Sequence, residues 1–114
     1  MERTTNSDIE VVVKFKGISS VEDVPDFEFA FYTEMHKDET VVCSKAGGAF
    51  VNCVVEEFPQ FTLPYCQVKC MLENHNLKPG RLCVHAHIKW TDPDYSDGVR
   101  NDRYRKKLDL IIVK

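Results

Sequence analysis

The sequence predicts an all-β fold, an antiparallel immunoglobulin-like β-sandwich of about seven strands. Three observations lead to this prediction. Apolar side chains recur in short runs with a period of two, which is the spacing of a half-buried strand. Gly and Pro residues separate these runs at intervals typical of sandwiches and barrels. The chain of 114 residues has the usual length of one domain, so residues 1–114 are expected to share a single core.

Two runs alternate most clearly between apolar and polar side chains, at residues 26–33 and 81–90. In each run the large apolar side chains fall on one face of the predicted strand. Three Phe side chains on one face supply a large apolar area for burial. The predicted core therefore contains Phe27, Phe29, Phe31, Val84, Ile88 and Trp90.

Five further strands are expected at residues 9–16, 40–45, 49–56, 65–72 and 108–113. Residues 35–39 are polar and predict a turn, whereas residues 91–98 contain Pro, Gly and three Asp and predict a long loop. The pair Gly47-Gly48 predicts a tight turn that joins residues 40–45 and 49–56 into a hairpin. In residues 65–72 the more apolar set of alternating side chains is expected to face the core, namely Cys66, Val68, Cys70 and Leu72.

Composition argues against nucleic acid and membrane partners. The net charge is −3 and the sequence pI is near 5.8, whereas a nucleic-acid-binding domain is usually basic. The basic residues near the C-terminus are diluted by three Asp and predict a solvated loop and strand end: Arg100, Arg103, Arg105, Lys106 and Lys107. No apolar run approaches the roughly 20 residues of a membrane span. Residues 1–8 lack the apolar stretch of a secretory signal, so a soluble protein is expected.

The five cysteines are Cys43, Cys53, Cys66, Cys70 and Cys83. An odd number of cysteines without a signal peptide argues against a disulfide framework. All five are therefore expected to be free, mostly buried thiols that hold no metal.

A zinc site is nevertheless conceivable around His85 and His87, whose side chains share one strand face with Cys83. Cys66 and Cys70 could lie on a nearby strand. They stand about 13 Å apart along an extended strand at ~3.3 Å per residue, so they cannot chelate one ion together. The alternative is a polar, solvent-facing strand surface, and this is the interpretation that the spacing favours.

Enzymatic activity is not expected. A Cys–His nucleophile pair needs a means of lowering the thiol pKa and a third orienting group, and the sequence shows neither. The acidic run at residues 92–98 resembles a calcium loop, but Arg103 and Tyr104 occupy the region where an EF-hand requires Glu. A structured turn is the favoured interpretation of this run, and no catalytic residue or cofactor is predicted.

Four segments together resemble a family of small β-sandwich domains in tail-fibre and baseplate-type proteins of phages that infect gut anaerobes. They are residues 26–33, 43–53, 74–82 and 90–101. The third contains Leu77-Lys78-Pro79-Gly80-Arg81-Leu82, which enters a long strand, and the fourth contains the loop Asp92-Pro93-Asp94-Tyr95-Ser96-Asp97-Gly98. The resemblance implies a non-enzymatic virion structural protein, made in the host cytoplasm and carried in the virion, and it brings no catalytic residues.

The expected role is a tail-fibre or baseplate adaptor that docks onto other virion proteins as a homo- or hetero-oligomer. A head-fibre or capsid-decoration protein is the nearest variant. A soluble glycan- or ligand-binding module is the alternative, with Trp90 and Tyr95 as candidate stacking residues. Residues 110–113 are continuously apolar, so one face of the last strand is expected to meet the core and the other a partner.

Overall fold

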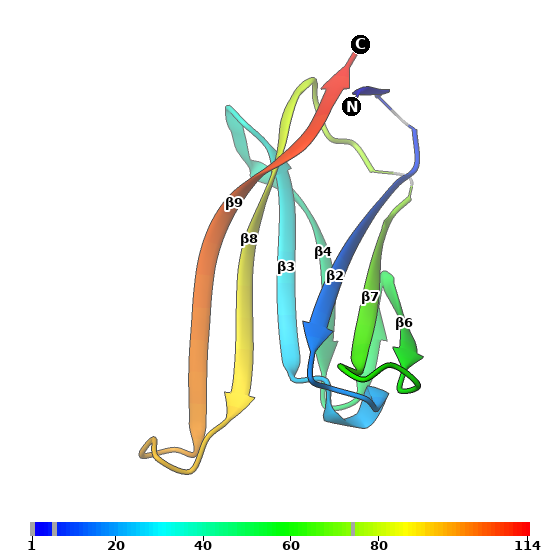
Figure 1. Cartoon of the computed structure of the whole chain (residues 1–114). Helices are drawn as coiled ribbons and strands as arrows, with labels where there is room; N and C mark the ends of the chain where they lie inside the picture. The colour runs from blue at the N-terminus through cyan, green and yellow to red at the C-terminus, as the bar shows by residue number, and fades with distance from the viewer. Residues whose placement is uncertain (1, 6, 74) are drawn as a thin grey trace.

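Two sheets form the chain, and a computed structural model describes residues 2–5, 7–73 and 75–114 of it (Figure 1). One sheet has six strands in the order β1-β9-β8-β3-β4-β5, and the other has three in the order β2-β7-β6. The strands are β1 (Glu2–Thr4), β2 (Ile9–Lys16), β3 (Asp26–Thr33), β4 (His36–Ala46), β5 (Ala49–Val51), β6 (Cys53–Phe58), β7 (Tyr65–Leu72), β8 (Gly80–Thr91) and β9 (Val99–Val113). A 3-10 turn, η1 (Val21–Asp23), follows β2. No helix in the described ranges is long and apolar enough to cross a membrane.

The predicted all-β fold is confirmed, although the described residues form nine strands rather than about seven. Most neighbouring strands are antiparallel, as predicted. The exception is β1, which the sequence did not predict and which runs parallel to the end of β9, with Glu2 opposite Ile111. This short pairing brings the two ends of the described chain side by side (Figure 1).

The core lies between the two sheets and confirms most of the predicted core residues. Phe29 and Phe31 are each 1% exposed, and Phe27, Val84 and Ile88 are also buried. From the other sheet, alternate residues of β7 face inward as predicted, namely Cys66, Val68, Cys70 and Leu72. The prediction for Trp90 is wrong in degree, because its indole lies at the margin of the core and is only partly buried.

The predicted hairpin is confirmed at its turn but wrong in its second strand. Gly47 and Gly48 have φ of 57° and 87° and connect β4 to β5, which is the backbone that a tight hairpin needs. The pairing with β4 ends at Val51. Asn52 then adopts φ of 56°, and the chain continues as β6 in the other sheet, where Cys53 lies opposite Cys70. A single residue in the left-handed region turns the chain because Asn tolerates that conformation.

Two strands are longer than predicted because a neighbouring strand extends their hydrogen bonding. β4 begins at His36, and the turn that precedes it contains Met35 with φ of 78°, so residues 36–39 are not a turn. β9 begins at Val99 rather than at residue 108, and Val99 is already paired with Thr91 at the end of β8. Residues 99–107 are mostly exposed, so they carry no apolar alternation for sequence reasoning to detect.

Candidate functional site

The two histidines of the predicted zinc site do not come together with Cys66 and Cys70. His85 is exposed on the outer face of β8, and the Nε2 atom of His87 lies 2.8 Å from the side-chain oxygen of Asn101. Cys66 and Cys70 point into the core from the other sheet. Within the described part of the chain, no group of three or more His, Cys, Asp or Glu side chains is arranged to hold a metal ion. The outer face of β8 is a polar strand surface.

Three thiols approach one another inside the core, and the sequence did not reveal this arrangement. Cys43 comes from β4, whereas Cys53 and Cys70 are neighbours on β6 and β7 of the opposite sheet. A hydrogen bond from Cys70 lowers the pKa of the Cys43 thiol. The same hydrogen bond, together with burial, raises the pKa of the Cys70 thiol. All five cysteines are buried free thiols in the structure. The thiols of Cys53 and Cys83 donate to the backbone carbonyls of Ser44 and Arg81.

His75 is a buried residue whose role sequence reasoning missed. Its Nδ1 atom accepts a hydrogen bond from the backbone N–H of Leu77 at 3.3 Å, and its Nε2 atom lies 2.7 Å from the carbonyl oxygen of Ser7. The imidazole therefore links the connection between β7 and β8 to the segment before β2. Both ring nitrogens are occupied by backbone groups, which indicates a structural role.

The acidic loop between β8 and β9 uses its carboxylates to hold its own backbone. The side chain of Asp92 accepts from the N–H of Asp94 at 3.0 Å, and that of Asp97 accepts from the N–H of Val99 at 3.1 Å. Arg100 lies 3.8 Å from the Asp92 carboxylate. Its guanidinium also covers the ring of Trp90, at 5.5 Å from the centroid. The loop is a structured turn, and the Trp90 face expected to stack on a sugar is already occupied.

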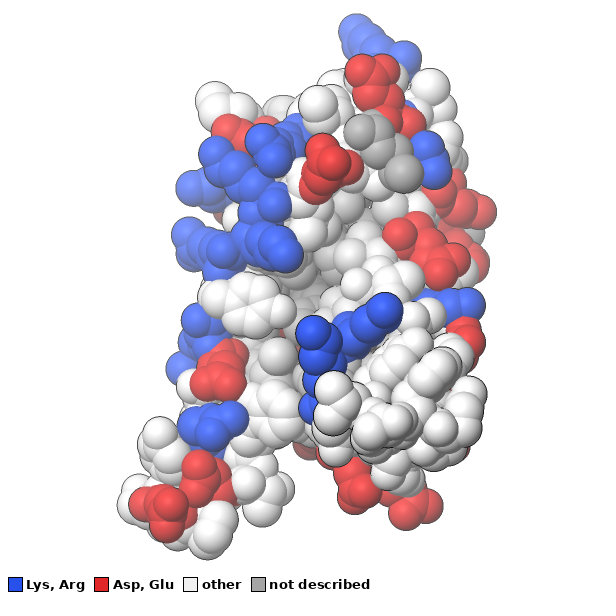
Figure 2. All heavy atoms as spheres, in the orientation of Figure 1, with Lys and Arg blue, Asp and Glu red and all other residues white. Residues whose placement is uncertain are grey.

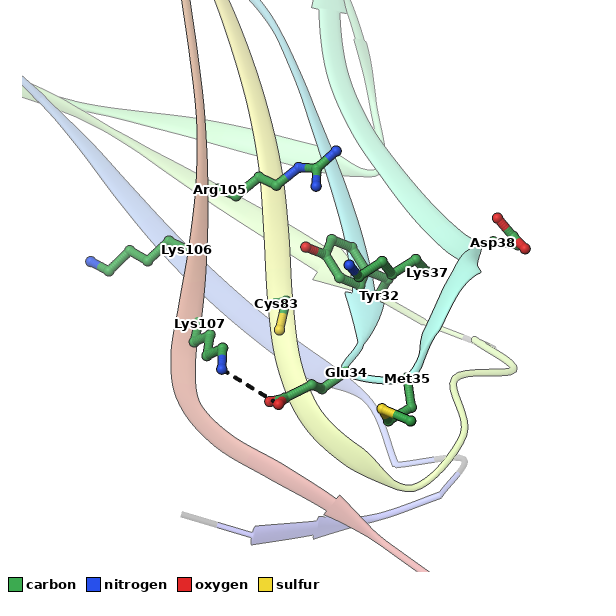
Figure 3. A pocket seen from close by; sticks show the side chains of 9 residues that line it. All are labelled: Tyr32, Glu34, Met35, Lys37, Asp38, Cys83, Arg105, Lys106 and Lys107. Carbon is green, nitrogen blue, oxygen red and sulfur yellow. Dashed lines mark hydrogen bonds and ion pairs between the residues drawn. The ribbon is translucent and has the colours of Figure 1, made fainter.

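A basin on the outer face of the six-stranded sheet collects part of the basic cluster (Figure 3). Its volume is about 720 Å³. Figure 3 shows Arg105 and Lys37 extending toward the ring of Tyr32, whereas Lys106 points away on the other side of β9. Lys107 is paired with Glu34 at 3.4 Å. The ion pairs of the described residues include neither Arg105 nor Lys37, but the carboxylates of Glu34 and Asp38 also line the basin, so it carries charges of both signs.

A second surface feature is a cluster of aromatic side chains around the connection between β6 and β7. The rings of Phe58 and Tyr65 stack at 4.8 Å between centroids, and Phe61 lies 5.9 Å from Tyr65. Phe61 is 51% exposed and Leu63 is 81% exposed. Figure 2 shows the uncharged surface that results over this end of the three-stranded sheet. We call these four residues, Phe58, Phe61, Leu63 and Tyr65, the aromatic patch.

A third feature is a groove between β2 and β9. It exists because the six-stranded sheet is wider than the three-stranded sheet, so β9 lies beyond the edge strand β2 (Figure 1). Its volume is about 250 Å³. The side chains that line it are Val11, Val12, Val13, Lys14, Phe29, Phe31, Val84, Tyr104, Lys106 and Leu108. Figure 2 shows the corresponding hollow beside the basic side chains of β9.

Comparison with known proteins gives no relative for this chain. No family model matches it, and no match was found among the curated proteins or the solved structures. The fold and surface define the class only as an all-β protein of two facing sheets with exposed apolar surface. Any functional assignment therefore depends on the geometry of these surfaces and on the residues that form them.

Proposed function

We propose that this protein is a non-enzymatic assembly module that docks onto other proteins. The aromatic patch is the observation that carries the proposal. Small soluble domains seldom leave large apolar side chains together at the surface, and such patches tend to mark interaction sites. Leu63 keeps most of its side chain exposed and Phe61 about half, while their neighbours Phe58 and Tyr65 are stacked on each other. A partner that covered this preorganised surface would bury apolar area at little entropic cost.

In its specific form, the proposal is a virion structural protein with an immunoglobulin-like sandwich fold. A tail-fibre or baseplate adaptor in contact with other virion proteins is the preferred role, and a head-fibre or capsid-decoration protein is the variant. Support comes from the sequence resemblance of residues 26–33, 43–53, 74–82 and 90–101 to such domains. The two-sheet all-β architecture is compatible with this role, and the aromatic patch and the open groove supply surfaces for neighbours.

The test is incorporation of patch variants into an assembled particle. Phe61→Asp combined with Leu63→Asp places charge on the patch and is expected to abolish incorporation while leaving the thermal unfolding midpoint nearly unchanged. Tyr95→Asp is the matched control, since Tyr95 is 50% exposed and Phe61 is 51% exposed. Density-gradient sedimentation followed by mass spectrometry measures incorporation. Equal incorporation of the double variant and the wild type would show that the patch is not a docking surface.

A further inference from the structure

The edge of β2 that faces the groove presents unpaired backbone groups, and the register of the three-stranded sheet shows which ones. The N–H of Gly17 donates to the carbonyl of Pro64 at 2.8 Å, in line with the β2–β7 register. Because hydrogen-bonded and non-hydrogen-bonded pairs alternate in an antiparallel ladder, the odd-numbered residues of β2 bond to β7. The N–H and C=O groups that point away from β7 are therefore those of Glu10, Val12, Lys14 and Lys16.

The other edges near this surface are better protected than β2. On β9, charged side chains occupy six of the nine positions from Val99 to Lys107, and charged side chains are a common defence of an exposed edge. β6 lies against η1, where the N–H of Val21 donates to Glu57 at 2.7 Å. β2 also carries charged side chains, at Glu10, Lys14 and Lys16, but the centre of its open edge is Val12, an apolar side chain that is 43% exposed. This edge is the one most suited to receive another strand.

A strand added to β2 would lie over the inner face of β8 and β9. Side chains on one face of that strand would point into the groove, toward Val84, Tyr104 and Leu108. Tyr104 is 43% exposed, so the added strand would bury apolar surface that the domain leaves open. Because β8 and β9 extend beneath the edge (Figure 1), the space accommodates one extended segment rather than the sheet of a second folded copy.

The charged side chains around the groove favour an acidic partner segment. The charged side chains that line the groove are Lys14 and Lys106, and no carboxylate lines it. Lys16 follows Lys14 on the same face of β2, and the acidic Glu10 lies at the start of that face. Opposite charges on directly facing residues stabilise a strand pair, whereas like charges destabilise it. Acidic side chains on the partner strand would therefore match the lysines of β2.

We propose that β2 and the inner face of β9 bind an extended acidic segment of a partner protein as an added β-strand. Apolar side chains of that segment face the groove and alternate with Asp or Glu side chains that face Lys14 and Lys16. Main-chain hydrogen bonds to Glu10, Val12 and Lys14 supply affinity, and the alternation supplies specificity. This inference rests on the proposed assembly function and names the chemistry of one partner.

The probe is a fluorescently labelled peptide of alternating valine and glutamate, long enough to span β2, and binding is measured by fluorescence anisotropy. The wild-type protein is expected to bind it at least about tenfold more tightly than the matched valine–lysine peptide, a factor equivalent to 1.4 kcal/mol. In hydrogen exchange, the amides of Glu10, Val12 and Lys14 are expected to become protected when the peptide binds. Equal affinity for the two peptides, or no binding of either, would overturn the proposal.

Backbone and charge variants sharpen the test. Val12→Pro removes an outward N–H, and Val12→Thr retains it, so only the Pro variant is expected to lose about tenfold or more in affinity. Lys14→Glu with Lys16→Glu is expected to invert the preference between the two peptides, whereas Lys89→Glu with Lys37→Glu makes the same charge change elsewhere and is expected to keep it. Unchanged preference in the β2 variant would refute the charge argument, even if Val12→Pro does not fold.

The two proposals fail separately. The aromatic-patch variant, Phe61→Asp with Leu63→Asp, is expected to bind the peptide like the wild type. If the protein enters particles but binds neither peptide, the strand-addition inference alone is contradicted. A protein that binds the acidic peptide but enters no particle contradicts the virion role alone.

Discussion

At the scale of single residues, the buried thiols are the groups whose pKa values the fold shifts most consistently. Burial is the largest cause of the raised pKa of Cys53, Cys66 and Cys83. Cys43 differs, because its hydrogen bond from Cys70 stabilises the thiolate and lowers the pKa. A thiol reacts through its thiolate and must be accessible, so Cys43, Cys53, Cys66 and Cys70 act as apolar filling between the sheets, whereas Cys83 is buried on the outer face of β8, beside the basin.

The raised thiol pKa values predict that the folded protein loses stability in alkaline solution. A thiol with a raised folded pKa contributes its full stability below the unfolded value of 9.0 and loses it as the pH rises toward the folded pKa. We expect the urea concentration at the midpoint of unfolding to be lower at about pH 10 than at about pH 7.5. In Cys66→Ala, which lacks one such thiol, the fall should be smaller. An equal fall in both proteins would show that Cys66 makes no contribution.

At the scale of elements, the passage from β5 to β6 decides how the chain is divided between the two sheets. Asn52 makes this passage with φ of 56°, and its side-chain amide donates to the carbonyl of Val42 at 3.0 Å. Without this turn, residues 49–56 would continue alongside β4 as one hairpin. The turn instead places Cys53 in the core beside Cys70.

Substitution at Asn52 tests whether this left-handed turn limits stability. Asn52→Val is expected to lose about 1–2 kcal/mol more than Asn52→Gly, because a β-branched side chain is strained in the left-handed region and Gly is not. Both variants lose the same side-chain hydrogen bond to Val42, so their difference isolates the backbone. Chemical denaturation followed by intrinsic fluorescence measures both values. Equal stability of the two variants would contradict the assigned backbone conformation.

At the scale of the whole molecule, the unequal widths of the two sheets determine which surfaces remain open. The six-stranded sheet extends past the three-stranded sheet, so the inner face of β9 is only partly covered. Toward the C-terminus the same strand is anchored in the core. Ile112 is 1% exposed, whereas Ile111 is 44% exposed on the opposite face. The expected division of the last strand between a core face and an outer face is present, and its contact with a partner stays a prediction.

Charge substitutions on the last strand separate folding from association. Ile112→Lys is expected to destabilise the fold by about 3 kcal/mol or more, because it buries an unpaired charge. Ile111→Lys is expected to change stability by no more than about 0.5 kcal/mol and to weaken self-association or incorporation into a particle. Thermal unfolding and analytical ultracentrifugation measure the two effects. Undiminished association of Ile111→Lys would refute a contact at this strand.

The sequence by itself determined the local properties of this protein. Alternation with a period of two identified β3, β7 and most of β8, a run rich in Val and Phe identified β2, and Phe27, Phe29 and Phe31 were assigned correctly to the core. Gly47 and Gly48 marked their turn because positive φ is a local requirement. The five free cysteines and the self-contained acidic loop also agree with the structure. In each case the signal lies within a few neighbouring residues.

Only the tertiary structure decided which strands pair and where each sheet ends. The meeting of Cys43 with Cys70, the change of sheet at Asn52 and the strand character of residues 99–107 depend on partners distant in sequence. The groove beside Val12 is of the same kind, because it results from the difference in width between two sheets. Hydrogen bonding between strands is nearly independent of side-chain identity, so the alternation shows which face of a strand is buried but not which strand lies beside it.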